Sequence, residues 1–315
     1  MDNSKPMREA AAEAQPSSFD ILDIDIAADD SLAEAGYKAL RQRYIHAGGR
    51  DAWALTSLSD AAPAHIAQLN ATMRRLRSDG RLFESGFRQK AIRPVLRHIR
   101  HLATQLSQAH ESHQQRLRLA DYVERCDEEA RIGLESLIQA WQSQTDELLV
   151  KLIASLNDDA HQDWLDSMDA IARGDGIADA ERPIEPGEPA YVRHVMRAVI
   201  ETRLRSVRAF DTLPDVPSPN QMIALRHAIE RLAYVVESLV SAKPFDGARD
   251  LLAACHAAVD AYSPVCEAYA AASSAYHFAT KQRVAASGAR SFADAQTKVA
   301  EARLGDWRGL LRPLL

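Results

Sequence analysis

The chain has 315 residues, a formal net charge of −6 at pH 7 and 46% hydrophobic residues. This length can bury a large core without disulfides. The three cysteines (Cys126, Cys255 and Cys266) are odd in number and unevenly spaced, which favours buried thiols in a reducing compartment. No stretch approaches the ~20 apolar residues of a membrane span, and the N-terminus lacks the apolar core of a secretory signal. We therefore expect a cytoplasmic protein without a membrane span.

The composition and the spacing of apolar residues predict an all-α fold. Alanine, leucine, arginine and glutamate dominate, β-branched runs are short, and apolar residues return every three or four positions. Residues 1–28 are predicted to be a mobile N-terminal lead. Within it, residues 19–26 alternate apolar and acidic side chains, and this is the only strand-like pattern in the chain.

The first half of the chain is predicted to consist of helices bounded by familiar start and stop signals. Proline suits the first turn of a helix, aspartate favours helix starts, and glycine ends helices. The expected helices begin after Asp30, at Pro63, after the breaks at Gly86 and Pro94, and over residues 127–156, and the sequence Asn157-Asp158-Asp159 is expected to cap the next helix.

The second half is predicted to follow a linker over residues 172–189, where glycines, prolines and acids exclude a regular element. Its expected helices begin after Pro189, at the Ser218 cap, and over residues 246–262, 264–286 and 291–312. These signals predict one helical domain over residues 29–285, with halves of about 29–173 and 188–285, and a C-terminal helix within residues 286–315.

Basic side chains gather on two predicted helices in the first half. Residues 74–101 contain nine arginines and lysines and two acids, a net charge of +7 in an acidic chain. Charge concentrated in this way costs self-repulsion, which a bound polyanion would relieve. The alternative is that these side chains pair with acids of neighbouring helices, such as Asp127 and Glu128. The candidate polyanion-binding residues are Arg74, Arg77, Arg81, Arg93, Arg97, Arg100 and His101 in the first half, and Arg193, Arg197, Arg205, Arg208, Arg226 and Arg231 in the second.

One helix in each half carries a related sequence, LNATMRRLRSDGRLF at 69–83 and LRHAIERLAYVVESL at 225–239. Both resemble the signature of the CHAD family, the conserved histidine α-helical domain, in which an arginine-rich helix recurs in each half. The chain departs from that signature at several positions. Ala67 and Ile223 stand where the family has histidine, and Glu230 and Ala233 stand where it has basic residues.

The resemblance implies two pseudo-twofold-related four-helix bundles of long antiparallel helices, with basic residues of both halves lining a shared groove. It also implies binding of inorganic polyphosphate. Such a ligand offers a charge on every unit and no bases to stack on, so it needs guanidinium groups rather than aromatic rings. Aromatic residues make up 6% of the chain and do not interleave with the basic runs, which disfavours nucleic acid as a partner.

No pattern in the chain predicts catalysis, a metal site or a cofactor. There is no glycine-rich phosphate loop and no nucleophile elbow. His98 and His101, and likewise His110 and His113, have a spacing that can ligate a metal, but Arg97 and Arg100 would repel a cation from the first pair. We expect His98, His101 and His194 to enlarge the basic surface instead.

Two functional hypotheses follow. The first is a non-enzymatic module that binds inorganic polyphosphate, or a similar polyanion, through arginines of both halves. The alternative is a helical scaffold, or a granule-associated module, that has lost much of its anion affinity and binds other proteins. The missing signature residues and the net charge of −6 favour the alternative.

Overall fold

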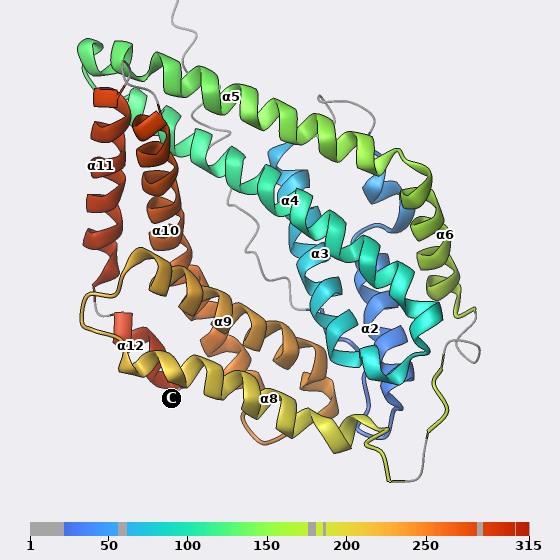
Figure 1. The fold of residues 1–315 in the computed structure, drawn as a ribbon. Helices are drawn as coiled ribbons and strands as arrows, with labels where there is room; N and C mark the ends of the chain where they lie inside the picture. The colour runs from blue at the N-terminus through green and yellow to red at the C-terminus, as the bar shows by residue number, and fades with distance from the viewer. Residues whose placement is uncertain are drawn as a thin grey trace, which may run out of the picture.

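The computed structural model describes residues 22–55, 62–175, 181–184, 187–281, 286–305 and 307–314. These residues form an all-α fold with two isolated β-bridges and no strand, as predicted (Figure 1). The α-helices are α2 (Leu32–His46), α3 (Pro63–Phe83), α4 (Gln89–Val123), α5 (Glu128–Leu156), α6 (Asp159–Arg173), α8 (Val192–Arg208), α9 (Pro219–Leu239), α10 (Ala248–Lys281), α11 (Ala286–Leu304) and α12 (Trp307–Leu311). Short 3₁₀ turns follow several of them, at Gly49–Trp53, Glu84–Gly86, Ala209–Thr212, Val240–Ala242 and Arg312–Leu314.

Side-chain caps fix the starts of several helices, because the first backbone N–H groups of a helix have no partner within it. The Ser218 hydroxyl accepts a hydrogen bond from Gln221 N, whose side chain bonds back to Ser218 N. Asp158 caps α6 through His161 N at 2.7 Å. The predicted cap at Ser218 and the predicted cap at the start of α6 are both confirmed.

The two halves repeat the same order of helices, α2 to α6 and α8 to α12. Helices α3 and α9 each have 21 residues and begin with proline. Like helices meet across the molecule, since α3 contacts α9 and α5 contacts α11. Ser31 and Tyr191, the N-caps of α2 and α8, form an antiparallel bridge. A pseudo-twofold axis requires such pairing of like with like, and the axis itself stays a prediction.

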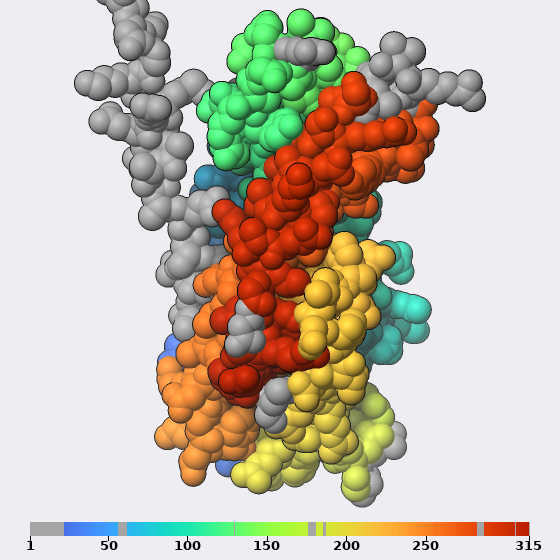
Figure 2. Space-filling model, turned by 90° about the vertical axis from the view of Figure 1, so that its left-hand side faces the viewer, coloured from blue at the N-terminus to red at the C-terminus, as the bar shows by residue number. Residues whose placement is uncertain are grey.

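A close helix crossing joins α5 to α11 at the end of the molecule remote from α6 (Figure 1). A Cβ atom placed on Gly288 would lie 2.4 Å from the carbonyl oxygen of Gly133, so only glycine fits there. A separate cluster of buried side chains, including Trp141 and Phe292, packs around this end. Beyond it, α11 and the residues that follow run down the outside of the molecule, with α8 in yellow on one side (Figure 2).

Three predicted boundaries differ from the structure. Helix α4 begins at Gln89 and runs through Pro94, where the sequence predicted a break. Helix α10 runs through Pro264, where the sequence predicted a break. A proline inside a helix removes one backbone hydrogen bond, and the burial of Tyr262, Val265 and Cys266 on this stretch offsets that loss. The single terminal helix expected over 291–312 is instead α11 and α12, separated at Gly305, which has a φ of +44°.

The expected mobile lead also differs from the structure where it is described. Residues 1–21 lie outside the described residues. Residues 22–28 are packed against the domain, because Ile24 and Ile26 are buried in the main core and Asp23 accepts a hydrogen bond from Ser241 of the second half. The alternation that suggested a strand therefore serves to bury two isoleucines in a segment without regular secondary structure.

Candidate functional site

A cavity of about 900 Å³ lies between the two halves, with walls from α3, α4, α8, α9 and α10. Six arginines and three glutamates line it, a formal excess of three positive charges. The arginines are Arg74, Arg77 and Arg81 of α3, Arg203 of α8, and Arg226 and Arg231 of α9. Residues far apart in the sequence therefore share one basic cavity.

Helix geometry explains why α3 supplies three of these arginines. At ~100° per residue, Arg74, Arg77 and Arg81 fall within about 60° of one another on the helix surface. Arg75 lies about 100° from Arg74 and points to another environment. An adjacent side of α3 carries Leu69, Met73 and Leu76, all fully buried in the core. Packing of that apolar face therefore turns the three arginines toward the second half.

Two of the cavity arginines share one carboxylate. The Oε2 atom of Glu230 lies 2.5 Å from an Nη2 of Arg74, and its Oε1 atom lies 2.8 Å from Nη2 of Arg226. The Glu230 side chain is 4% exposed. Burial opposes the charge on Arg74, but Tyr234 and Glu230 more than offset it, so its pKa is raised. One buried carboxylate therefore pairs with both arginines within the protein.

The other four arginines, Arg77, Arg81, Arg203 and Arg231, have no carboxylate partner among the described residues. Burial lowers the pKa of Arg77, and the like charges of Arg81, Arg100 and Arg74 lower it further. Its Nε atom is buried and lacks a hydrogen-bond partner. A buried donor in a field of like charge is unfavourable by itself. An anion in the cavity would satisfy both the donor and the charge.

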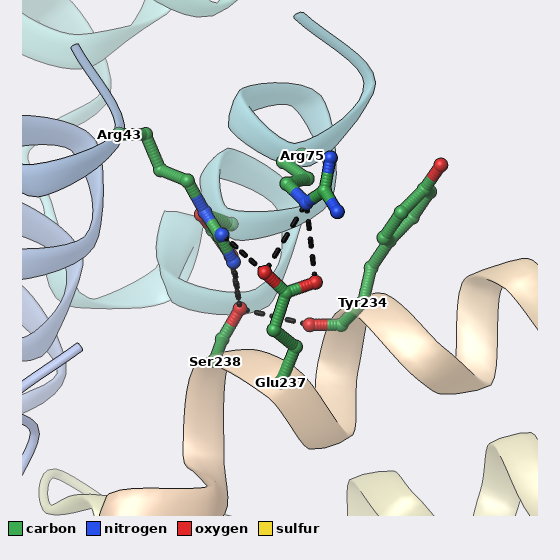
Figure 3. A network of polar contacts seen from close by, with 6 residues as sticks. Arg43, Arg75, Tyr234, Glu237 and Ser238 are labelled. Carbon is green, nitrogen blue, oxygen red and sulfur yellow. Dashed lines mark hydrogen bonds and ion pairs between the residues drawn. The ribbon is translucent and has the colours of Figure 1, made fainter. Parts of the chain in front are cut away.

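Next to the cavity, α3 and α9 are joined by a buried network in which every charge has a partner (Figure 3). Glu237 of α9 accepts from Arg43 Nη1 at 2.5 Å and from Arg75 Nε at 3.2 Å. Asp79 accepts from Arg43 Nε at 3.1 Å, and the Ser238 hydroxyl donates to Asp79. Burial raises the pKa of Asp79 against the opposing effect of Arg43. These side chains hold α2 and α3 to α9 and are closed to a ligand.

The family model for the CHAD domain matches residues 38–274, which is most of the chain and includes the cavity and the network. The chain belongs to the CHAD domain family. This family is linked to polyphosphate binding. The family predicted from the sequence is thereby confirmed.

Solved structures with the same fold include a CHAD domain from the plant Ricinus communis and PptA from Streptomyces chartreusis. The plant domain has a TM-score of 0.68 at 19% identity, covering 94% of this chain and 96% of that chain. PptA has a TM-score of 0.68 at 14% identity, covering 90% of this chain and all of its own. A search of curated proteins found no match. At these identities the structures establish the fold alone.

The basic residues at the start of α4 lie outside the cavity of this CHAD domain. Arg93, Arg97, Arg100 and His101 are all exposed and do not line it. Helix α4 reaches the cavity later in its length, through residues such as Ser107, His110 and Gln114. Of the predicted α4 residues, Arg100 acts on the cavity electrostatically, since its like charge contributes to the lowered pKa of Arg77.

Helix α8 turns the arginines that we predicted away from the cavity. Arg193 pairs with Asp29, Arg205 pairs with Glu201 at 3.1 Å, and Arg197 donates to the carbonyl oxygen of Pro244. Arg208 is exposed outside the cavity. Arg203 lines the cavity but was not among the predicted residues. At ~100° per residue, it lies about 80° to 160° around the helix axis from the other four arginines. The apolar stripe of α8 (Val195 and Val199) borders the same face and could have indicated Arg203.

The histidines do not share one role. His98 is partly buried and stacks on Trp164, and its Nε2 atom lies 3.0 Å from Nδ1 of His161. Burial lowers its pKa. Our expectation that His98 enlarges a basic surface is therefore wrong. His110 and His227 line the cavity, and burial lowers the pKa of both. His194 lines it and is exposed. Within the described residues, no group of three or more His, Cys, Asp or Glu could hold a metal ion.

The position of Tyr234 bears on which ligand the cavity could hold. Tyr234 lines the cavity, and Cζ of Arg75 lies 5.6 Å from the centre of its ring. Its ring is largely buried, so it offers no open face for stacking a base.

Among the described helices, none combines the length and apolar character needed to cross a membrane.

Proposed function

We propose that this CHAD domain binds inorganic polyphosphate, or a similar polyanion, in the cavity between its halves and without catalysis. The observation that carries the proposal is the set of four arginines from α3, α8 and α9 that face one cavity without a carboxylate partner among the described residues. Arg77, with its buried and unpartnered Nε, is the proposed centre of the site. Guanidinium groups meet phosphate oxygens through two parallel hydrogen bonds, which suits a chain of phosphates.

The candidate residues predicted from the sequence therefore have different roles in this proposal. Arg77, Arg81 and Arg231, together with Arg203, are proposed to contact the ligand. Arg100 and His194 are proposed to add positive potential near it. The remaining predicted arginines of α4 and α8 lie outside the cavity, where exposed charges contribute mainly to the rate of ligand encounter.

The test compares two double charge reversals that change the net charge equally. One variant carries Arg77→Glu and Arg203→Glu, one residue from each half and both in the cavity. The control carries Arg97→Glu and Arg205→Glu, also one from each half, both exposed and outside it. Each charged contact is worth about 1.5–3 kcal/mol, so the cavity variant should lose at least ~100-fold in polyphosphate affinity at low salt.

We expect the control variant to lose less than ~5-fold, since exposed charges are screened by salt. Wild-type affinity should fall steeply as salt rises. Binding measured by fluorescence anisotropy of labelled polyphosphate decides the matter. The proposal is wrong if the wild type does not bind at low ionic strength, or if the two variants lose affinity equally.

A further inference from the structure

Glu230 holds a position in the cavity that resembles that of a bound anion. It lies on α9, and its two oxygens receive guanidinium groups from opposite halves, Arg74 at 2.5 Å and Arg226 at 2.8 Å. Its side chain is almost fully buried. A phosphate group could be bound in the same way, with one guanidinium group on each of two of its oxygens.

The other two glutamates of the cavity are held differently. Glu267 pairs with Arg118 at 2.7 Å, and Arg118 does not line the cavity. Glu111 makes no ion pair among the described residues, and desolvation of its carboxyl at the cavity wall raises its pKa despite the nearby charges of Arg74 and Arg226. Glu230 is thus the cavity glutamate that directly occupies two cavity arginines.

We propose that Glu230 is a specificity-determining residue of the anion site and acts as a resident counter-anion. It withholds Arg74 and Arg226 from the ligand and confines phosphate to Arg77, Arg81, Arg203 and Arg231. This inference rests on the proposed function. A carboxylate fixed on α9 beside the two guanidinium groups competes at a high effective concentration, so a phosphate group must displace it to reach the two arginines. The domain therefore binds with fewer phosphate contacts than its six arginines allow.

The decisive variant is Glu230→Gln, which keeps the shape and an acceptor oxygen but removes the charge. It frees two guanidiniums, and each phosphate contact contributes ~0.7–0.9 to the slope of log affinity against log salt. We expect the slope to steepen by about 1 to 2 units and the affinity for polyphosphate at low salt to rise at least ~10-fold. The matched control is Glu111→Gln, which removes the same charge from the same cavity without releasing an arginine.

We expect Glu111→Gln to raise affinity less than ~3-fold and to leave the salt slope within about 0.5 of the wild-type value. A variant with both Glu230→Gln and Arg226→Gln should lose about half of the added slope, which assigns the gain to the freed arginine. Circular dichroism of each variant establishes that the helical fold is retained.

The outcomes separate this inference from the proposed function. If the wild type binds and the Glu230 and Glu111 variants share the same slope, the counter-anion role is wrong and the proposed function stands. If only Glu230→Gln binds, the counter-anion role stands and polyphosphate binding by the wild type is wrong. If neither binds at low salt, both are overturned.

Discussion

Two arginine clusters lie next to each other between α3 and α9, and they differ in the source of their countercharge. In the network of Figure 3, Arg43 and Arg75 meet the buried carboxylates of Glu237 and Asp79. In the cavity, Arg77 and its neighbours face one another, and burial and like charge lower the pKa of Arg77. Successive residues of one helix thus contribute to a closed structural network and to an open cationic site. The difference shows that an arginine indicates a binding site only where the fold leaves its charge unpaired.

The largest effect is expected from the network, through Glu237→Gln. This substitution leaves Arg43 and Arg75 buried with less countercharge, and breaking a buried ion pair typically costs about 3–5 kcal/mol. We expect the free energy of unfolding in urea to fall by this amount. The control is Glu201→Gln, which removes a surface pair with Arg205 and should cost less than about 0.5 kcal/mol. Equal losses in the two variants would show that the network is not a structural element.

His161 tests whether a buried polar atom without a partner is enough to mark a binding site. Its Nε2 atom is buried and unpartnered, like Nε of Arg77, but it lies beside His98 and Trp164 and away from the cavity. Burial, and then His98, lower its pKa from 6.5 to about 4. Between these values the unfolded chain binds more protons, so stability is complete above about pH 6.5 and is lost as the pH falls toward 4.

The expected loss over this window is at most about 3 kcal/mol. His161→Phe should flatten the dependence of the unfolding free energy on pH, whereas His46→Gln, at an exposed position, should leave it as in the wild type. Polyphosphate affinity at pH 7 should be the same in both variants. A loss of affinity in His161→Phe alone would break the distinction between the cavity and other buried polar groups.

The smallest effect on stability is expected from Arg77→Met. Because Arg77 has a buried, unpartnered Nε, and burial and like charges lower its pKa, its removal should leave the unfolding free energy unchanged or raise it by roughly 0.5–1 kcal/mol. The same substitution at Arg75 should lower it by about 3 kcal/mol, since Glu237 loses a partner. Urea unfolding of the two variants gives the measurement. A clear loss of stability in Arg77→Met would show that Arg77 stabilises the fold, as the arginines of the network do.

Helical periodicity explains both the successes and the failures among the candidate residues. On α3 the apolar stripe identified the buried side, so Arg74, Arg77 and Arg81 could be grouped on one face, and they line one cavity. On α8 the arginines lie on more than one face, and the sequence does not say which face meets the other half. The four residues that we chose there lie outside the cavity, and Arg203 lines it.

The sequence by itself determined the all-α class, the caps at Asp158 and Ser218, and the family, because these depend on local propensities and on spacing along the chain. Only the tertiary structure decided which charges are paired. Glu230 is 156 residues from Arg74 and Glu237 is 162 from Arg75, so no local pattern could bring them together. The free energy of a charge depends on the burial and the partners that the packed helices give it. That dependence separates the paired arginines of α3 from the unpaired ones.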